Sequence, residues 1–162
     1  MKASELIQSK IYTLPALQKV VFQWKYFGKT FAFTNGCFDI LHQGHIFSLS
    51  KAATEADYLI VGLNSDTSVE KLKGPGRPVN TQTSRAIVLA SLIMVDAVVI
   101  FEEETPLNLV KTLLPDVMVK GGDYRLNEIA GAGEVIAAGG RVVINPILEG
   151  FSTTGIIERS KT

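Results

Sequence analysis

The sequence of 162 residues predicts an α/β protein built on a doubly wound, parallel sheet of five strands. Short β-prone apolar runs alternate along the chain with segments whose apolar residues recur at helical spacing. Strands are expected at Phe31–Thr34, Tyr58–Leu63, Ala97–Phe101, Asp116–Lys120 and Arg141–Asn145. Helices are expected at Ile46–Glu55, Thr83–Met94, Pro106–Leu114, Leu126–Ala138 and Thr153–Arg159. Such alternation indicates parallel strands joined by crossover helices that cover both faces of the sheet.

The N-terminal part of the chain lies outside this alternation. Residues 1–29 are expected to form a helical extension, with one or two helices in Ala3–Phe27, packed beside a domain of residues 30–162. We assign this extension no chemistry. The length falls in the usual range for one compact domain, so a second catalytic domain is not expected.

Composition excludes several classes of function. Sixteen basic and sixteen acidic residues cancel, which argues against general nucleic-acid binding because that usually leaves a basic excess. The N-terminus lacks the apolar core of a signal peptide and no apolar run is long enough to span a membrane, so we expect a cytoplasmic protein with no membrane partner. Cys37 is the only cysteine, and no zinc-ligand spacing is present.

Both histidines of the chain lie within four residues of each other, in His42-Gln43-Gly44-His45. They follow the first strand and the turn around Gly36, and they open the helix that begins near Ile46. A helix N-terminus offers free backbone N–H groups to an anion, and His42 and His45, three residues apart, can project to one side of the first turn. The pattern therefore predicts a phosphate site. A helix N-terminus with incidental histidines is the simpler alternative.

Two glycine patterns resemble other nucleotide sites but fail in detail. Gly28-Lys29-Thr30 ends like a phosphate-binding P-loop, yet Gln23 stands where the first glycine is needed and the triplet precedes a strand. Gly131-Ala132-Gly133 begins like a dinucleotide fingerprint, but Ile136 occupies the third glycine position and no strand precedes it. We expect neither site.

The run Thr34-Asn35-Gly36-Cys37-Phe38-Asp39, followed by His42-Gln43-Gly44-His45, resembles the signature of the cytidylyltransferase-like nucleotidyltransferases. The resemblance extends over about residues 30–159. It includes Asn64-Ser65-Asp66, Lys71-Leu72-Lys73-Gly74 with Arg77-Pro78, Arg85 with Val95-Asp96, Lys120-Gly121-Gly122-Asp123-Tyr124, and Ser152-Thr153-Thr154 with Ile156-Ile157. Together these motifs are most similar to the adenylyltransferases of bacterial heptose activation.

The resemblance implies a Rossmann-like fold of the HxGH nucleotidyltransferase type, with strand order 3-2-1-4-5. It implies transfer of AMP from ATP to D-glycero-β-D-manno-heptose 1-phosphate, giving ADP-heptose and pyrophosphate for lipopolysaccharide or related glycan precursors. ATP would arrive with Mg²⁺ held through its phosphates, and we assign no metal ligand to the protein. A homodimer is expected, with Leu14–Phe27, including Trp24 and Tyr26, as a contact surface. A separate heptose kinase would supply the acceptor.

The resemblance also implies roles for individual residues. The catalytic groups are expected to be His42, His45 and Lys73, with Lys73 favoured over Lys71. The nucleotide is expected to contact Thr34, Asn35, Gly36, Cys37, Phe38, Gly44, Gly121, Asp123, Ser152, Thr153 and Thr154. The second substrate is expected to contact Asp39, Asn64, Arg77, Arg85, Lys120 and Tyr124.

Some of these assignments have structural alternatives. The basic segment of residues 71–78 contains two glycines and two prolines, which predicts an irregular loop that either folds over the phosphates or is simply solvated. Residues 120–124 could form a plain turn, and Ser152–Thr154 could act only as a helix cap. Arg85 could contact a phosphate or form a structural ion pair with Asp96.

Two other functions remain in view. A cytidylyltransferase acting on glycerol 3-phosphate or another polyol or sugar phosphate would keep the chemistry. Cytidylyltransferases generally carry an arginine shortly before the Ser-Thr-Thr element, whereas this chain has Ile147-Leu148-Glu149-Gly150-Phe151 there. A non-catalytic nucleotide-sensing domain would keep the fold but not the turnover. A class I synthetase fragment shares the histidine element, but this chain is too short to include an anticodon-reading domain.

Overall fold

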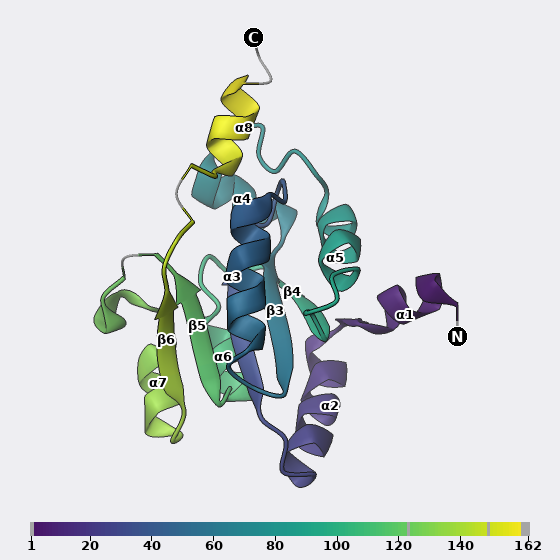
Figure 1. Ribbon diagram of the computed structural model, residues 1–162, viewed down its shortest axis with the longest axis vertical. Helices are drawn as coiled ribbons and strands as arrows, with labels where there is room; N and C mark the ends of the chain where they lie inside the picture. Colours follow the sequence, from purple (N-terminus) through teal and green to yellow (C-terminus); the bar gives the residue numbers. More distant parts are fainter. Residues whose placement is uncertain (1, 123, 149, 160–162) are drawn as a thin grey trace.

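The computed structural model describes residues 2–122, 124–148 and 150–159. In this part of the chain a single parallel sheet has six strands in the order β1-β4-β3-β2-β5-β6 (Figure 1). The strands are β1 (Ile11–Tyr12), β2 (Phe31–Gly36), β3 (Tyr58–Asn64), β4 (Ala97–Phe101), β5 (Val117–Gly121) and β6 (Arg141–Asn145). The doubly wound α/β class predicted from the sequence is therefore confirmed.

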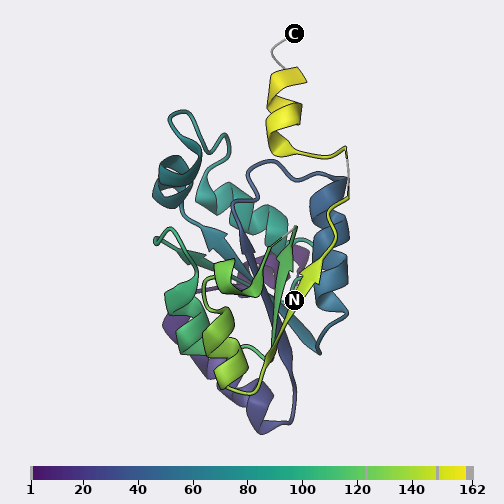
Figure 2. The ribbon, with the colours of Figure 1, turned by 90° about the vertical axis from the view of Figure 1, so that its left-hand side faces the viewer.

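Helices cover both faces of the sheet. They are α1 (Ala3–Ser9), α2 (Leu14–Tyr26), α3 (Gln43–Ala53), α4 (Asp66–Lys73), α5 (Gln82–Ala90), α6 (Leu107–Leu113), the 3₁₀ helix η1 (Leu126–Glu128), α7 (Ala132–Ala137) and α8 (Thr153–Arg159). One core joins α2, α6 and α7 to one face of the sheet, and a second core joins α3 and α5 to the other. Figure 2 shows α3 and α7 on opposite sides of the strands.

The strands alternate between these two cores residue by residue. In β2, Phe31 and Phe33 belong to the core under α2 and α6, whereas Ala32 between them belongs to the core under α3 and α5. All three side chains are fully buried. Because both faces of β2 are apolar and covered, its polar residues can occur only where the strand ends, and this places Thr34 and Asn35 at the edge where ligands bind in parallel sheets.

The N-terminal segment differs from the expected helical extension. Ile11 and Tyr12 form β1, which pairs in parallel with Val98 and Val99 of β4 and adds a sixth strand. Two residues carry no detectable period-two pattern, so the sequence gives no sign of this strand. The five expected strands take the expected order. In the predicted dimer surface, Trp24 stacks inward on Tyr58 with ring centroids 4.1 Å apart.

Two helix predictions need correction. Residues 71–73, expected in an irregular loop, form the last turn of α4, which Ser65 caps at its start and which ends at Gly74 with a positive φ of 92°. The helix expected over residues 126–138 is divided into η1 and α7 at Gly131, which also has a positive φ. Within the described residues, none of the helices combines the length and the hydropathy needed to cross a bilayer.

Candidate active site

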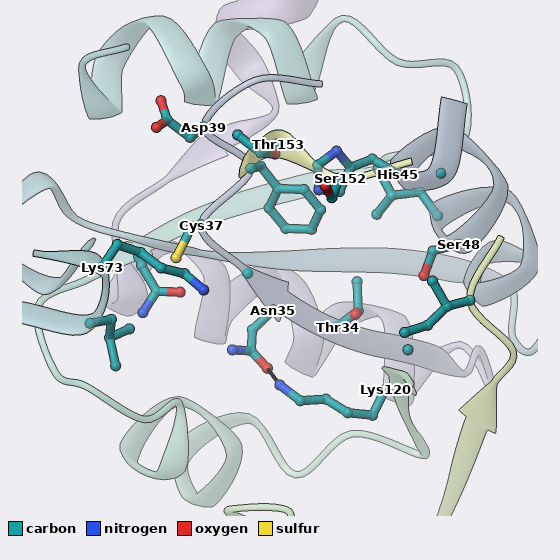
Figure 3. A pocket seen from close by; sticks show the side chains of 18 of the residues that line it. Thr34, Asn35, Cys37, Asp39, His45, Ser48, Lys73, Lys120, Ser152 and Thr153 are labelled. Atoms are coloured by element: carbon teal, nitrogen blue, oxygen red, sulfur yellow. Dashed lines mark hydrogen bonds between the residues drawn. The ribbon is translucent and has the colours of Figure 1, made fainter. Parts of the chain in front are cut away.

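A cavity of about 680 Å³ lies at the carboxyl ends of β2, β3 and β5 and is bordered by the starts of α3 and α8. Its volume is within the range of sites that hold nucleotide-sized ligands. Figure 3 shows Lys73 and Lys120 reaching into it from different sides. Parallel strands deliver their carboxyl ends to one edge of the sheet, which explains why motifs far apart in the sequence meet here.

Nearly all the predicted site residues line this one cavity. Among those that the structure describes, Arg85 is the exception. Asp123 lies outside the described residues. The cavity therefore brings together the histidine turn, the end of α4, the segment after β5 and the start of α8.

The two histidines face each other at the start of α3. His42 is the N-cap residue of the helix, and its ring stacks on that of His45 with centroids 3.9 Å apart and planes 29° apart. Phe38 packs beside His45 and Phe151 beside His42, at centroid distances of 5.3 and 6.3 Å. These contacts fix both rings against the first turn of the helix.

Burial keeps these imidazoles neutral. Desolvation lowers the pKa of His42, and desolvation together with the charge on His42 lowers the pKa of His45 to about 4. The Nδ1 atoms of both rings are buried and have no hydrogen-bond partner within the described chain. An unpaired buried acceptor is less costly than an unpaired buried N–H, so the arrangement favours protons on the Nε2 atoms.

Glycine at position 44 makes the ring positions possible. A Cβ atom there would lie 3.0 Å from Cε1 and 3.1 Å from Nδ1 of His42, and 3.2 Å from Cβ of Phe151. These distances are shorter than ordinary van der Waals contacts, so any side chain would push the His42 ring or the Phe151 segment away. Gly44 thus has a steric role in addition to backbone freedom.

Lys120 and Asn35 form a polar pair on the other side of the cavity. The Nζ atom of Lys120 donates to Oδ1 of Asn35 at 2.9 Å and lies 5.8 Å from the ring centre of Tyr124. Burial lowers the pKa of Lys120, and burial raises the pKa of the nearby Cys37 thiol. A thiol with a raised pKa is a poor nucleophile.

Lys73 ends α4 and lines the cavity, whereas Lys71 does not line it. The side chain of Lys73 forms no ion pair or hydrogen bond within the described residues, and Figure 3 shows it directed into the cavity. Its ammonium group is therefore available to a ligand.

Asp39 is buried, with only 4% of its surface exposed. Its carboxylate accepts hydrogen bonds from Nε of Arg77 at 2.8 Å and from the backbone N–H groups of Val79 and Asn80 at 2.9 and 3.0 Å. Although burial acts to raise it, the pKa of Asp39 is lowered overall by these hydrogen bonds. The carboxylate already accepts these three internal hydrogen bonds, and its contact with the substrate stays a prediction.

Arg85 has a structural environment. Its guanidinium donates to the carbonyl oxygens of Cys37, Asn64 and Asn80 at 2.6, 2.9 and 3.0 Å, and it pairs with Asp66 at 2.7 Å. The structural ion pair considered from the sequence therefore exists, but its partner is Asp66. Asp96 instead accepts a hydrogen bond from the backbone N–H of Leu59. Arg85 ties the ends of β2 and β3 to the segment after α4.

The start of α8 closes the cavity above the histidines. Oγ of Ser152 accepts from the N–H of Gly155 at 3.0 Å, as a cap residue does, and Oγ1 of Thr153 donates to the carbonyl of Ile40 at 3.3 Å. The second bond ties the predicted nucleotide motif Ser152–Thr154 to the histidine turn. Phe151, which precedes this helix, packs beside His42, and Figure 3 draws Ser152 and Thr153 in the same part of the cavity as His45.

Several lining residues were missed from the sequence. They are Ser48, Leu49, Leu72, Glu104, Thr105, Pro106, Glu128, Ile129, Ala130, Pro146, Ile147 and Phe151. Ser48 lies on the His45 face of α3, and helical spacing from His45 could have identified it. Residues 104–106 follow β4. Because β4 was expected beside β3, the carboxyl end of β4 could have been predicted to border the same cavity.

The described residues contain no group of three or more His, Cys, Asp or Glu side chains that could hold a metal ion. Of the three lining carboxylates, Asp39 is engaged by Arg77, Glu128 accepts from the backbone N–H of Arg125 at 2.9 Å, and Glu104 is exposed. The residues present therefore fit a divalent cation that is carried by ligand phosphates better than one held by protein ligands alone.

A family model described as cytidylyltransferase-like matches residues 33–159. The chain belongs to this family. The match spans β2 through α8 and so includes every segment that borders the cavity. Membership identifies the chain as a nucleotidyltransferase, as its motifs predicted.

Curated relatives in the family are close. The bifunctional protein HldE of Mesorhizobium japonicum is 57% identical over 139 residues, which cover 86% of this chain and 28% of that protein. The bifunctional protein HldE of Rhodospirillum rubrum is 52% identical over 151 residues, which cover 93% of this chain and 30% of that protein. The chain thus spans less than a third of the length of these relatives.

Solved structures share the architecture. A lipopolysaccharide core biosynthesis protein from Thermoplasma volcanium superposes with a TM-score of 0.62 at 26% identity, covering 75% of this chain and 98% of that one. A pantoate–β-alanine ligase from Francisella tularensis also has a TM-score of 0.62 but only 16% identity, covering 93% of this chain and 76% of that one, so it supports the fold alone.

Proposed function

We propose that this protein transfers AMP from ATP to D-glycero-β-D-manno-heptose 1-phosphate and releases pyrophosphate. The observation that carries the proposal is the stacked pair of neutral imidazoles, His42 and His45, which line the same cavity as Lys73 and Lys120. The motif resemblance to heptose adenylyltransferases and the high identity to HldE proteins support the choice of sugar.

The acceptor phosphate needs little activation. A sugar 1-phosphate is largely a dianion at neutral pH because its second pKa is near 6. It attacks the α-phosphorus of ATP directly, the new P–O bond forms, and the bond to pyrophosphate breaks in line with it. No strong general base is required, so catalysis rests on positioning and on stabilising the charge of the transferring group.

The histidines supply hydrogen bonds in this reaction. With protons on Nε2, each neutral ring donates to the α-phosphoryl or pyrophosphate oxygens as charge develops on them. The free N–H groups at the start of α3 and the positive end of its dipole act in the same direction. Mg²⁺ arriving with ATP would neutralise part of the phosphate charge.

Lys73 and Lys120 are assigned to different parts of the substrates. Lys73 approaches from α4 and balances charge on the transferring phosphate and the acceptor. Lys120 is held by Asn35 next to Tyr124, at the end of β5, where we place the nucleoside. Ser152–Thr154 at the start of α8 lie above the histidines and are placed against the pyrophosphate.

The test is a pyrophosphate-release assay over a grid of four nucleoside triphosphates and several phosphorylated acceptors. The proposal expects ATP with the heptose 1-phosphate to give the highest kcat/KM. A preference for CTP with glycerol 3-phosphate would instead establish the polyol-phosphate cytidylyltransferase. Nucleotide binding without turnover on any acceptor would indicate the sensing domain. A heptose kinase is expected to supply the acceptor, and a coupled reaction with such a kinase checks that step.

A further inference from the structure

Asp39 holds the segment that follows α4. Its side chain is 1% exposed, and its carboxylate binds three donors from one short stretch of chain, namely Arg77, Val79 and Asn80. A fourth bond runs from Nδ2 of Asn80 to the carbonyl oxygen of Asp39 at 2.8 Å. The turn that carries the histidines and the segment that carries Arg77 are therefore fastened to each other through one residue.

The way in which Arg77 is held leaves its phosphate-binding edge free. Asp39 contacts Nε, which lies on the side of the guanidinium. Neither Nη atom has a protein partner within the described residues, and Arg77 lines the cavity with 17% of its side chain exposed. The two Nη groups form the planar fork that pairs with two oxygens of one phosphate.

The position of Arg77 in the fold favours the acceptor over the nucleotide. The segment of residues 74–80 follows β3 and α4, on the side of β2 away from β5 and β6. Pyrophosphate is placed at α8 and the nucleoside at β5. In an in-line displacement the attacking oxygen approaches the phosphorus opposite the leaving group. A cation arriving from the β3 side is therefore placed to meet the incoming phosphate.

We propose that Asp39 is a positioning residue that holds Arg77 side-on, so that the Nη fork of Arg77 binds the phosphate of the acceptor. This deepens the proposed function and rests on it. Asp39 does not touch the substrate; it acts through Arg77. The carboxylate is required because an amide at this position would turn either an N–H group or a single weak acceptor toward Nε.

Asp57 provides a matched control at the opposite end of the sheet. Its carboxylate also accepts from a backbone N–H, that of Thr30 at 2.9 Å, and from a cation, Lys29 at 3.0 Å. It lies between the starts of β2 and β3, away from the cavity. Replacing Asp57 with Asn removes similar interactions without touching the site.

The test is a double-mutant cycle with Asp39→Asn, Arg77→Lys and the double variant, with Asp57→Asn as control. Pyrophosphate release is measured against acceptor concentration at saturating ATP, and against ATP at saturating acceptor. Each single variant is expected to raise the KM for the acceptor by about 10-fold or more, because one bidentate charged contact is lost. The KM for ATP should change by less than about twofold. The double variant should have an acceptor KM no higher than that of the more impaired single variant, because both substitutions remove the same interaction.

Additive effects of the two substitutions, or an unchanged acceptor KM in Asp39→Asn, would overturn the proposal. If Asp39→Asn does not fold, Asp39→Glu keeps the charge but displaces the fork, and it should raise the acceptor KM in the same way. Urea unfolding of every variant separates a loss of stability from a loss of binding.

A second readout separates this proposal from the choice of sugar. Inorganic phosphate is titrated calorimetrically into the same proteins. Weaker phosphate binding in Asp39→Asn and Arg77→Lys, but not in Asp57→Asn, supports a phosphate site formed by Arg77 and positioned by Asp39, whichever sugar the acceptor carries. Equal affinity in all of them overturns it. Failure of the wild-type protein to use the heptose 1-phosphate counts against the proposed function alone.

Discussion

The imidazole rings of His42 and His45 stack with their centroids 3.9 Å apart at the first turn of α3. Two rings this close and this desolvated cannot both carry a positive charge without a large penalty. The depressed pKa of His45, about 4, is the consequence. The pair is thus suited to donate hydrogen bonds as neutral rings, and it is not suited to form a dication.

The depressed pKa predicts a pH dependence of stability. In the unfolded chain His45 titrates near 6.5, whereas in the folded protein it titrates at about 4. Below pH 6.5 the unfolded state binds a proton that the folded state does not, so the free energy of unfolding should fall as the pH drops from 6.5 to about 4. Urea unfolding of the wild type and of His45→Gln between pH 6.5 and 4 tests this prediction. The free energy of unfolding should decline less in His45→Gln than in the wild type.

Carboxylates should not obscure this effect. The hydrogen bonds of Asp57 with the N–H of Thr30 and with Lys29 lower its pKa to about 2. Its contribution to the free energy of unfolding is therefore lost as the pH falls from about 3.8 to about 2, below the range in which His45 acts. Titratable groups that the wild type and His45→Gln share contribute equally to both pH profiles, so their effect cancels when one profile is subtracted from the other. Equal slopes for the wild type and His45→Gln between pH 6.5 and 4 would contradict a buried, neutral His45.

Gly44→Ala should impair catalysis by moving His42. The added methyl would lie 3.0 Å from Cε1 of His42, and the ring or the Phe151 segment must shift to relieve the contact. The shift needed is a few tenths of an ångström, and because displacements near 1 Å at a catalytic group lower the rate by about 100-fold, we expect a loss of about 10-fold. Initial rates of pyrophosphate release measure the loss.

Gly133→Ala is the control for this substitution. Gly133 lies in α7, and a methyl there would meet no atom within 4 Å. Alanine in a helix is favoured over glycine by about 1 kcal/mol, so this variant should retain full activity with equal or higher stability. Similar activities for Gly44→Ala and Gly133→Ala would show that the position of His42 does not matter.

Substitution of Lys73 should lower the activity far more than substitution of Lys71. Both lie in the last turn of α4, but Lys73 lines the cavity and Lys71 does not. Lys73→Met is expected to lower kcat by about 100-fold, because it removes a positive charge that is directed into the cavity toward the transferring phosphate. Lys71→Met should stay within about twofold of the wild type, because Lys71 does not line the cavity. Equal losses in the two variants would assign the effect to the net charge of the segment.

Arg85→Lys should act on stability. Lysine cannot reproduce the planar set of donors that binds the carbonyls of Cys37, Asn64 and Asn80, and each buried carbonyl left unpaired costs about 1–3 kcal/mol. The free energy of unfolding should therefore fall by about 2 kcal/mol or more, measured in urea. A raised KM with unchanged stability would show a direct contact with substrate.

The sequence predicts the frame of this protein well because the signals are local. Buried parallel strands such as β4 are apolar on both faces, and both β4 and the edge strand β6 have the bounds that their residues indicate. The position of the histidines follows from the strand that precedes them and the helix that they open. Strand β1 could not be predicted, since two residues carry no pattern and their pairing with β4 is a long-range contact.

The internal partners in the site were harder to predict. Asp39 stands within the motif, and the sequence suggests a contact with substrate, yet its three donors come from a segment about forty residues later. Arg85 likewise pairs with Asp66, not with Asp96. Charged residues in a motif can serve the ligand or the loops that surround it, and only the tertiary arrangement decides between them.

The central claim is that His42 and His45 stabilise charge on the phosphates of ATP during transfer. The most direct measurement is kcat for pyrophosphate release from ATP and the heptose 1-phosphate, in the wild type, His42→Ala and His45→Ala, with folding checked by circular dichroism. We predict a loss of about 100-fold or more in each folded variant. Turnover within a few fold of the wild type in either variant would contradict the claim.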